Sequence, residues 1–255
     1  MSGHSKWATT KYRKGAQDSA RSKLFAKLVR QVEVAAREGG SDLTSNATLR
    51  TMFTKAREAS VPMETIERAI KRGTGELEGV RYEAISYEGY APAGVAVMAE
   101  CLTDNRNRTG AEVRSLFTRN GGSIAEPGAV SWQFERKGIL VLSKERGEDE
   151  VMEVALDAGA EDLSDGDDHW EVTCAPADLS RVRESLEAAG VEVRSAELTF
   201  VPTTTVLVDN ESHARTVLRL VNALDDHDDV QNVYANFDIP DAILSRLDAQ
   251  DAASP

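Results

Sequence analysis

The stretch from 138 to 200 decides the fold, because strand and helix patterns follow one another in it with only short connections. GILVLS (138–143) predicts a strand and EDEVMEVALDAG (148–159) a helix. AEDLSDGDDHWEVTC (160–174) is typical of a hairpin around an Asp/Gly turn, and it precedes a helix, ADLSRVRESLEAAG (177–190), and a closing strand, VRSAELTF (193–200). The order β-α-β-β-α-β predicts a ferredoxin-like domain.

Towards the N-terminus the pattern indicates three short amphipathic helices. Apolar residues recur at helical spacing from Asp18 to Glu38, where Gly39 and Gly40 end the pattern. We expect this helix to bury Leu24, Phe25 and Leu28 and to show on its opposite face Lys23, Lys27, Arg30 and Arg37. Two further helices are expected, at 45–59 and between Pro62 and Gly73. Three helices with brief links suggest a small bundle.

The segments that flank the central stretch have mixed α and β patterns. We expect strands at 82–88, 94–102 and 130–134, and a helix from a capping box at Thr109 and Glu112 to Asn120. After Pro202 a second set follows, with a strand at 203–208, a helix at 211–226 and a strand at 230–237. These elements are too few for a domain of their own, so we expect them to pair with 82–134.

The predicted fold class is therefore α+β and multidomain. An N-terminal three-helix bundle precedes two α+β domains, one of them ferredoxin-like and inserted into the other. The expected parts are a basic arm and bundle at 1–75, a discontinuous domain at 80–136 plus 202–240, the inserted domain at 137–201, and a polar tail at 241–255.

Composition limits the environment of the protein. In 255 residues, of which 29% are charged, no apolar run approaches the roughly 20 residues of a membrane span. The basic N-terminus has no apolar stretch behind it, so it is not typical of a secretory signal. The two cysteines, Cys101 and Cys174, lie far apart in apolar-alternating stretches, which predicts buried thiols in a reducing compartment. We expect a cytoplasmic protein without a membrane partner.

Motifs for catalysis are missing from the sequence. The four histidines form no metal-spaced pair, and no P-loop, nucleophile elbow or dinucleotide-binding glycine motif occurs. The acidic runs DGDDH (165–169) and DDHDD (225–229) have only weak potential for a cation and are more typical of solvated loops. We therefore expect no enzyme activity, no cofactor, no metal site and no small-molecule substrate.

Charge is distributed unevenly along the chain. Residues 1–75 contain 15 Lys/Arg and 7 Asp/Glu, a net charge of +8, whereas residues 76–255 carry −21. A basic segment on an acidic body suggests contact with nucleic acid, and an interleaved aromatic residue can stack on a base. The candidate contacts in the first segment are Lys6, Trp7, Lys11, Tyr12, Arg13, Lys14, Arg21, Lys23, Lys27 and Arg30. Packing of Trp7 against the bundle remains an alternative.

Five ordered blocks of the sequence resemble the YebC family. They are GHSKW (3–7), KYRKGAQDSARSKLFAKLVR (11–30), SVPMETIERAIKRGTGE (60–76), YEGYAPAGVAVMAECLTDNRNRT (87–109) and GSIAEPGAVSWQFERKG (122–138). The resemblance implies a fold of three domains and a role in gene expression through nucleic-acid binding. Tyr12 departs from the histidine that relatives often have at this place.

The resemblance leaves the nucleic acid open. One possibility is a probable transcriptional regulator that binds promoter DNA; the other is a translation factor that binds ribosomal RNA and eases difficult sequences such as proline runs. The resemblance also favours phosphate contact by Asn105, Arg106 and Arg108. We expect these residues to precede a helix N-terminus, where backbone N–H groups attract anions. A third hypothesis is an adaptor whose acidic domains bind a basic protein partner.

Overall fold

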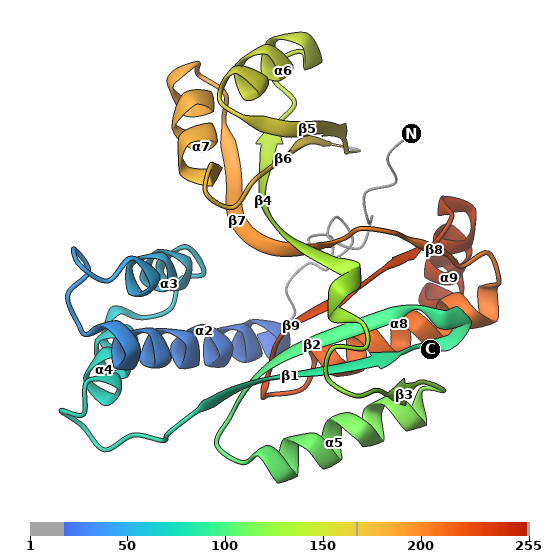
Figure 1. Cartoon of the computed structure of the whole chain (residues 1–255), viewed down its shortest axis with the longest axis horizontal. Helices are drawn as coiled ribbons and strands as arrows, with labels where there is room; N and C mark the ends of the chain where they lie inside the picture. Colours follow the sequence, from blue (N-terminus) through green and yellow to red (C-terminus); the bar gives the residue numbers. More distant parts are fainter. Residues whose placement is uncertain (1–17, 167, 254–255) are drawn as a thin grey trace. The chain divides into compact units, whose positions relative to one another are not determined.

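A computed structural model describes residues 18–166 and 168–253. The described residues form two compact units. Of these residues, one unit contains 18–129 and Asn210–Val233, and the other contains Val130–Asp209 and 234–253. The fold is mixed α+β, with the N-terminal helices first, as predicted (Figure 1). The domain boundaries expected from the sequence remain a prediction.

Three helices form the N-terminal bundle: α2 (Asp18–Gly39), α3 (Ala47–Glu58) and α4 (Met63–Gly73). Asn46 caps α3, since its Oδ1 accepts from the Leu49 backbone N–H at 2.9 Å. Gly73 is required at the α2–α4 contact, because a Cβ there would collide with the backbone carbonyl of Glu33. The core holds Leu28, Val32, Leu49, Val61 and Ile66.

One expectation for α2 was wrong. Leu24 was predicted to be buried, but its exposed fraction is 47%, whereas Leu28, one turn further on, is buried. Phe25 is partly buried against the bundle core, so the apolar stripe of α2 becomes fully buried only from Leu28 onwards.

The sheet of the same unit has the order β3-β1-β2-β9. Its strands are β1 (Glu83–Tyr90), β2 (Ala96–Thr103), β3 (Ser123–Ile124) and β9 (Val230–Ala235). The unit also contains α5 (Arg106–Arg119), α8 (Glu211–Asp225) and a 3₁₀ turn, η1 (Pro92–Gly94). Strand β9 pairs beside β2 although more than 120 residues separate them, so the expected return of the chain after Pro202 to the first sheet holds for this strand.

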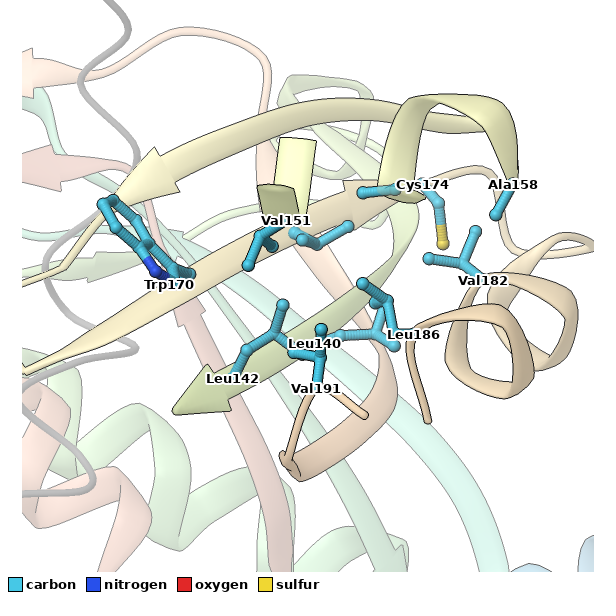
Figure 2. Packing of buried hydrophobic residues seen from close by; sticks show 11 residues of the cluster. Leu140, Leu142, Val151, Ala158, Trp170, Cys174, Val182, Leu186 and Val191 are labelled. Atoms are coloured by element: carbon cyan, nitrogen blue, oxygen red, sulfur yellow. The ribbon is translucent and has the colours of Figure 1, made fainter. Parts of the chain in front are cut away.

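The second unit contains the ferredoxin-like arrangement that the sequence predicted. Its elements are β4 (Phe134–Ser143), α6 (Glu148–Asp157), β5 (Ala160–Asp165), β6 (His169–Cys174), α7 (Leu179–Ala188) and β7 (Val193–Pro202). The strand order is β5-β6-β4-β7, and all three pairings are antiparallel. Figure 2 shows how Leu140 and Leu142 of β4 lie with Val151 of α6 and Leu186 of α7 in one buried cluster.

Other expectations needed correction in this unit. The expected strand at 130–134 is a 3₁₀ turn, η2 (Ser131–Gln133), and only Phe134 begins a strand. The strand expected at 203–208 shrinks to β8 (Val206–Leu207), which pairs in parallel with β10 (Phe237–Asp238) and not with the first sheet. The region expected as a polar tail contains α9 (Asp241–Ala253), whose Ile243 and Leu247 are buried.

Among the described helices, none combines the length and the apolar character that a bilayer crossing needs.

Candidate functional site

The site begins with three cations on one side of α2. Lys23, Lys27 and Arg30 stand at i, i+4 and i+7, which places them in a row along the helix. All three contact the same stretch, Asp225-Asp226-His227-Asp228-Asp229, which we call the acidic segment. This stretch joins the end of α8 to β9. The face that the sequence predicted to be basic therefore meets the run DDHDD, about 200 residues away in the chain.

The two lysines make the looser contacts of this row. Lys23 Nζ lies 3.3 Å from Asp226 Oδ1, and the two side chains are 42% and 72% exposed. Lys27 Nζ donates to the backbone carbonyl of Asp225 at 2.6 Å and lies 3.5 Å from its carboxylate. The exposed pair of Lys23 and Asp226 contributes roughly 0–1 kcal/mol, whereas the side chain of Lys27 is only 11% exposed.

Arg30 is held much more firmly. Its Nη1 donates to the carbonyls of Leu102 and Asp228, each at 2.9 Å, and to Asp229 Oδ1 at 3.1 Å. Its guanidinium also lies 4.8 Å from the ring centroid of Tyr82, a cation–π distance. Arg30 therefore ties the bundle to β2 and to the start of β9.

Asp229 is the centre of the site. Its side chain is only 5% exposed, and Oδ2 accepts from Arg108 Nη2 and from Thr109 Oγ1, each at 2.6 Å. Burial alone would raise the pKa of this carboxyl, but the hydrogen bonds from Thr109 and Arg108 and the charges of Arg108 and Arg30 outweigh it and hold the pKa below its ordinary value. Asp229 is thus an ionised carboxylate that joins α2, α5 and the acidic segment.

A relay of hydroxyl groups extends from this carboxylate. Because Thr109 donates to Asp229, its oxygen accepts from the Thr103 hydroxyl at 2.7 Å. Thr103 Oγ1 in turn accepts from the backbone N–H of Asn105 at 2.9 Å. The start of α5 is therefore fixed by buried hydrogen bonds.

This geometry corrects the expected start of α5. Asn105 is the N-cap, accepting from the Arg108 N–H at 3.1 Å, and the helix begins at Arg106. Thr109 lies inside the helix and is buried, so the predicted capping box at Thr109 and Glu112 was wrong. Arg106 and Arg108 do not precede the helix; they belong to its first turn.

The mixed charges line an open cleft of about 690 Å³. The cleft is lined by the last four residues of the acidic segment and by six residues from other elements: Lys23, Arg30, Tyr82, Asp104, Arg108 and Glu112. Arg108 also lies 3.0 Å from Asp104, and its pKa is raised chiefly by its hydrogen bond to Asp229. Its side chain is 43% exposed, so one side of this cation still faces solvent.

Glu112, His227 and Asp229 bring ligand-type atoms within 4.8 Å of one another, but their chemistry does not suit a cation. The Asp229 backbone N–H donates to His227 Nδ1 at 3.1 Å, so a neutral ring carries its proton on Nε2. This proton points to Glu112 Oε2 at 2.9 Å. Asp229 already forms ion pairs with Arg30 and Arg108, and a metal ion would have to displace these arginines.

The remaining predicted contacts fall into two groups. Arg21 lies in the first turn of α2, and Arg106 is exposed in the first turn of α5 with its carbonyl accepting from Tyr87. Outside the described residues lie Lys6, Trp7, Lys11, Tyr12, Arg13 and Lys14. Sequence reasoning missed Asp229, Thr109 as its donor, His227 and Tyr82. The only signal was the run DDHDD, which says nothing about its partners.

The cysteines are buried thiols, as predicted. Burial raises the pKa of Cys101 to about 12 and also raises that of Cys174. Neither thiol has the thiolate character that a nucleophile needs.

Two family models cover nearly the whole chain. The TACO1/YebC protein N-terminal domain matches residues 5–76, and the TACO1/YebC second and third domain matches residues 82–237. Proteins named probable transcriptional regulatory protein from Thermobifida fusca and Acidothermus cellulolyticus are 56% and 55% identical over 249 residues, which is 97% of this chain and 100% of each relative. The Thermotoga maritima protein of the same name is 54% identical over 254 residues, with the same coverage.

A solved structure agrees with these matches. The crystal structure of a conserved hypothetical protein from Aquifex aeolicus superimposes with a TM-score of 0.79 at 48% identity, over 88% of this chain and 92% of that one. With the family models and the full-length relatives, it establishes that the chain belongs to the TACO1/YebC family.

Proposed function

We propose that this protein is a cytoplasmic, non-enzymatic regulator of gene expression that binds nucleic acid through its basic N-terminal arm. The name shared by its relatives, probable transcriptional regulatory protein, supports the regulatory role. The observation that carries nucleic-acid binding is the charge division, +8 before residue 76 and −21 after it. Promoter DNA is the target that the relatives' name favours.

The contacts that we propose are the residues predicted from the sequence. Lys6, Lys11, Arg13 and Lys14 would supply most of the charge, and Trp7 and Tyr12 would stack on bases. Lys23 and Arg108 keep 42% and 43% of their side chains exposed, which leaves them able to meet a phosphate. Arg30 and Lys27 are less suited, because their side chains are only 16% and 11% exposed and already contact Asp229 and Asp225.

Ribosomal RNA is a second candidate target. The specific observation in its favour is the charge of −21 carried by residues 76–255, which a long DNA duplex would repel more than a short basic arm entering folded RNA would. Crosslinking in cells, followed by sequencing of both DNA and RNA, separates the two. Discrete promoter peaks support the first target, and dominant ribosomal RNA reads support the second.

The arm itself is tested by substitution. Lys11→Ala, Arg13→Ala and Lys14→Ala together should weaken binding to a labelled DNA duplex or RNA hairpin and flatten the salt dependence by about 0.7–0.9 per lost phosphate contact. A matched control removes three arginines that already pair with neighbours on their own helix or turn: Arg146, Arg181 and Arg183. An equal loss in both variants would count against the arm.

A further inference from the structure

The acidic segment presents carboxylates where a nucleic acid would have to present phosphates. Of its five residues four are aspartates, and three of these carboxylates lie within 4 Å of a cation on α2. A phosphate backbone seeking Lys23 or Lys27 would meet these aspartates first. Three of the cations that the sequence predicted for binding, Lys23, Lys27 and Arg30, are thus already occupied from within the chain.

The contacts become looser from one end of the row to the other. The aspartates become more exposed along the row, from 5% at Asp229 through 37% at Asp225 to 72% at Asp226. Of the three cations, Arg30 and Lys27 are 16% and 11% exposed, and Lys23 is 42% exposed. A buried pair with extra hydrogen bonds is costly to break, whereas an exposed one exchanges easily and is screened by salt. The segment is therefore anchored at Asp229 and releasable at Asp226.

The position of Asp225 and Asp226 at the end of α8 also favours the release of their carboxylates. Asp225 is the last residue of α8 and Asp226 is its C-cap, where the helix dipole disfavours negative charge. The charge of Lys23 therefore compensates the Asp226 carboxylate at the C-cap. If a polyanion takes the lysines, the carboxylates can turn to solvent while Asp229 keeps the backbone in place.

We propose that the acidic segment is a built-in competitor for nucleic acid. Asp226 occupies Lys23, and Asp225 occupies Lys27, until phosphates displace them. This inference rests on the proposed function and adds a regulatory contact to it. The competing aspartates lower the affinity of the protein for any polyanion that makes no further contacts to the basic arm. Weak, non-specific binding is therefore reduced more than binding that also engages the arm.

The test measures binding of the full chain to a labelled RNA hairpin and to a labelled DNA duplex as salt is varied. Asp225→Asn with Asp226→Asn should bind about two- to thirtyfold tighter than wild type, the range for two ion pairs of about 0.2–1 kcal/mol each. Its salt slope should become steeper by about 0.7–0.9 for each lysine that gains a phosphate. The matched control, Glu148→Gln with Asp149→Asn at the exposed start of α6, removes the same charge elsewhere.

Two outcomes would overturn the inference. One is equal tightening in both variants, which would reduce the effect to net charge. The other appears in a double-mutant cycle: Asp226→Asn should tighten binding in wild type but lose most of this effect in a Lys23→Ala background, and an undiminished effect would mean that Asp226 does not compete for Lys23. Wild-type protein that binds neither probe with any salt dependence would instead overturn the proposed function itself. Urea unfolding confirms that each variant is folded.

Discussion

Asp229 and Asp226 lie three residues apart in one segment, and each pairs with a cation of α2, yet their surroundings are opposite. Asp229 is 5% exposed and accepts from two arginines and a threonine, whereas Asp226 is 72% exposed and pairs with Lys23. The contrast shows that a row of similar ion pairs can combine a structural contact with an exchangeable one.

The two aspartates differ because water reaches the carboxylate of Asp226 but is largely excluded from that of Asp229. Water around Asp226 hydrates its carboxylate almost as well as Lys23 does, so losing that pair costs little. Asp229 has exchanged its water for three donors, and its partners would be left without an acceptor if it were removed. We therefore expect substitutions at the two positions to act on different properties, stability at one and binding at the other.

The largest effect is expected at Asp229. Asp229→Asn should lower the free energy of unfolding by about 3–5 kcal/mol, because it leaves Arg30 and Thr109 facing a neutral group in a buried site. The half-exposed Arg108 can recover water, which favours the lower end of this range. Urea unfolding followed by circular dichroism measures the change. A loss as small as that of Asp226→Asn, the matched control, would remove the distinction between the two ends.

Acid should reproduce part of this loss. The pKa of Asp229 is depressed in the folded state, so its contribution to stability is present above the ordinary aspartate value of about 3.9 and disappears as the pH falls through the lower, folded value. The difference in unfolding free energy between wild type and Asp229→Asn should thus be constant near neutral pH and shrink below about pH 4. Urea titrations of both proteins at several pH values measure it, and a difference that stays constant in acid would contradict the depressed pKa.

The sequence predicted the local elements of the fold but not the long-range contacts of the site. Helix α2 was predicted within one residue, because its apolar period and Gly39 are local signals. The ferredoxin-like order was predicted because six patterned segments lie in one continuous stretch. Asp229 was not found, since its partners Arg30 and Arg108 are 199 and 121 residues away and a single sequence contains no signal for such pairings.

The start of α5 was missed for a related reason. Thr109 with Glu112 satisfies the local pattern of a capping box, but the hydroxyl of Thr109 is used by Asp229, 120 residues later. A tertiary contact thus overrode a local pattern, and the true cap, Asn105, lies four residues upstream.

A smaller effect is expected at Thr109 itself. Thr109→Val keeps the shape of the side chain but removes one donor from Asp229 and the acceptor of the Thr103 hydroxyl, at a cost of about 1–2 kcal/mol in unfolding free energy. Thr109→Ser, which keeps the hydroxyl, is the control, and chemical denaturation compares the two. Any loss in Thr109→Ser measures the missing methyl group, and a Thr109→Val variant as stable as wild type would contradict the expected contribution of the hydroxyl.

The smallest effect on stability is expected at Asp226. Asp226→Asn should change the free energy of unfolding by less than about 1 kcal/mol, and the change should vanish at high salt, because an exposed pair is screened. Removing a carboxylate from the C-cap of α8 also relieves an unfavourable charge at the negative end of the helix dipole, which offsets the lost contact with Lys23. Urea unfolding at low and high salt measures the change in unfolding free energy and its dependence on salt. A loss approaching that of Asp229→Asn would mean that the exposed end is as structural as the buried one, and the segment could then not release its lysines to a phosphate backbone.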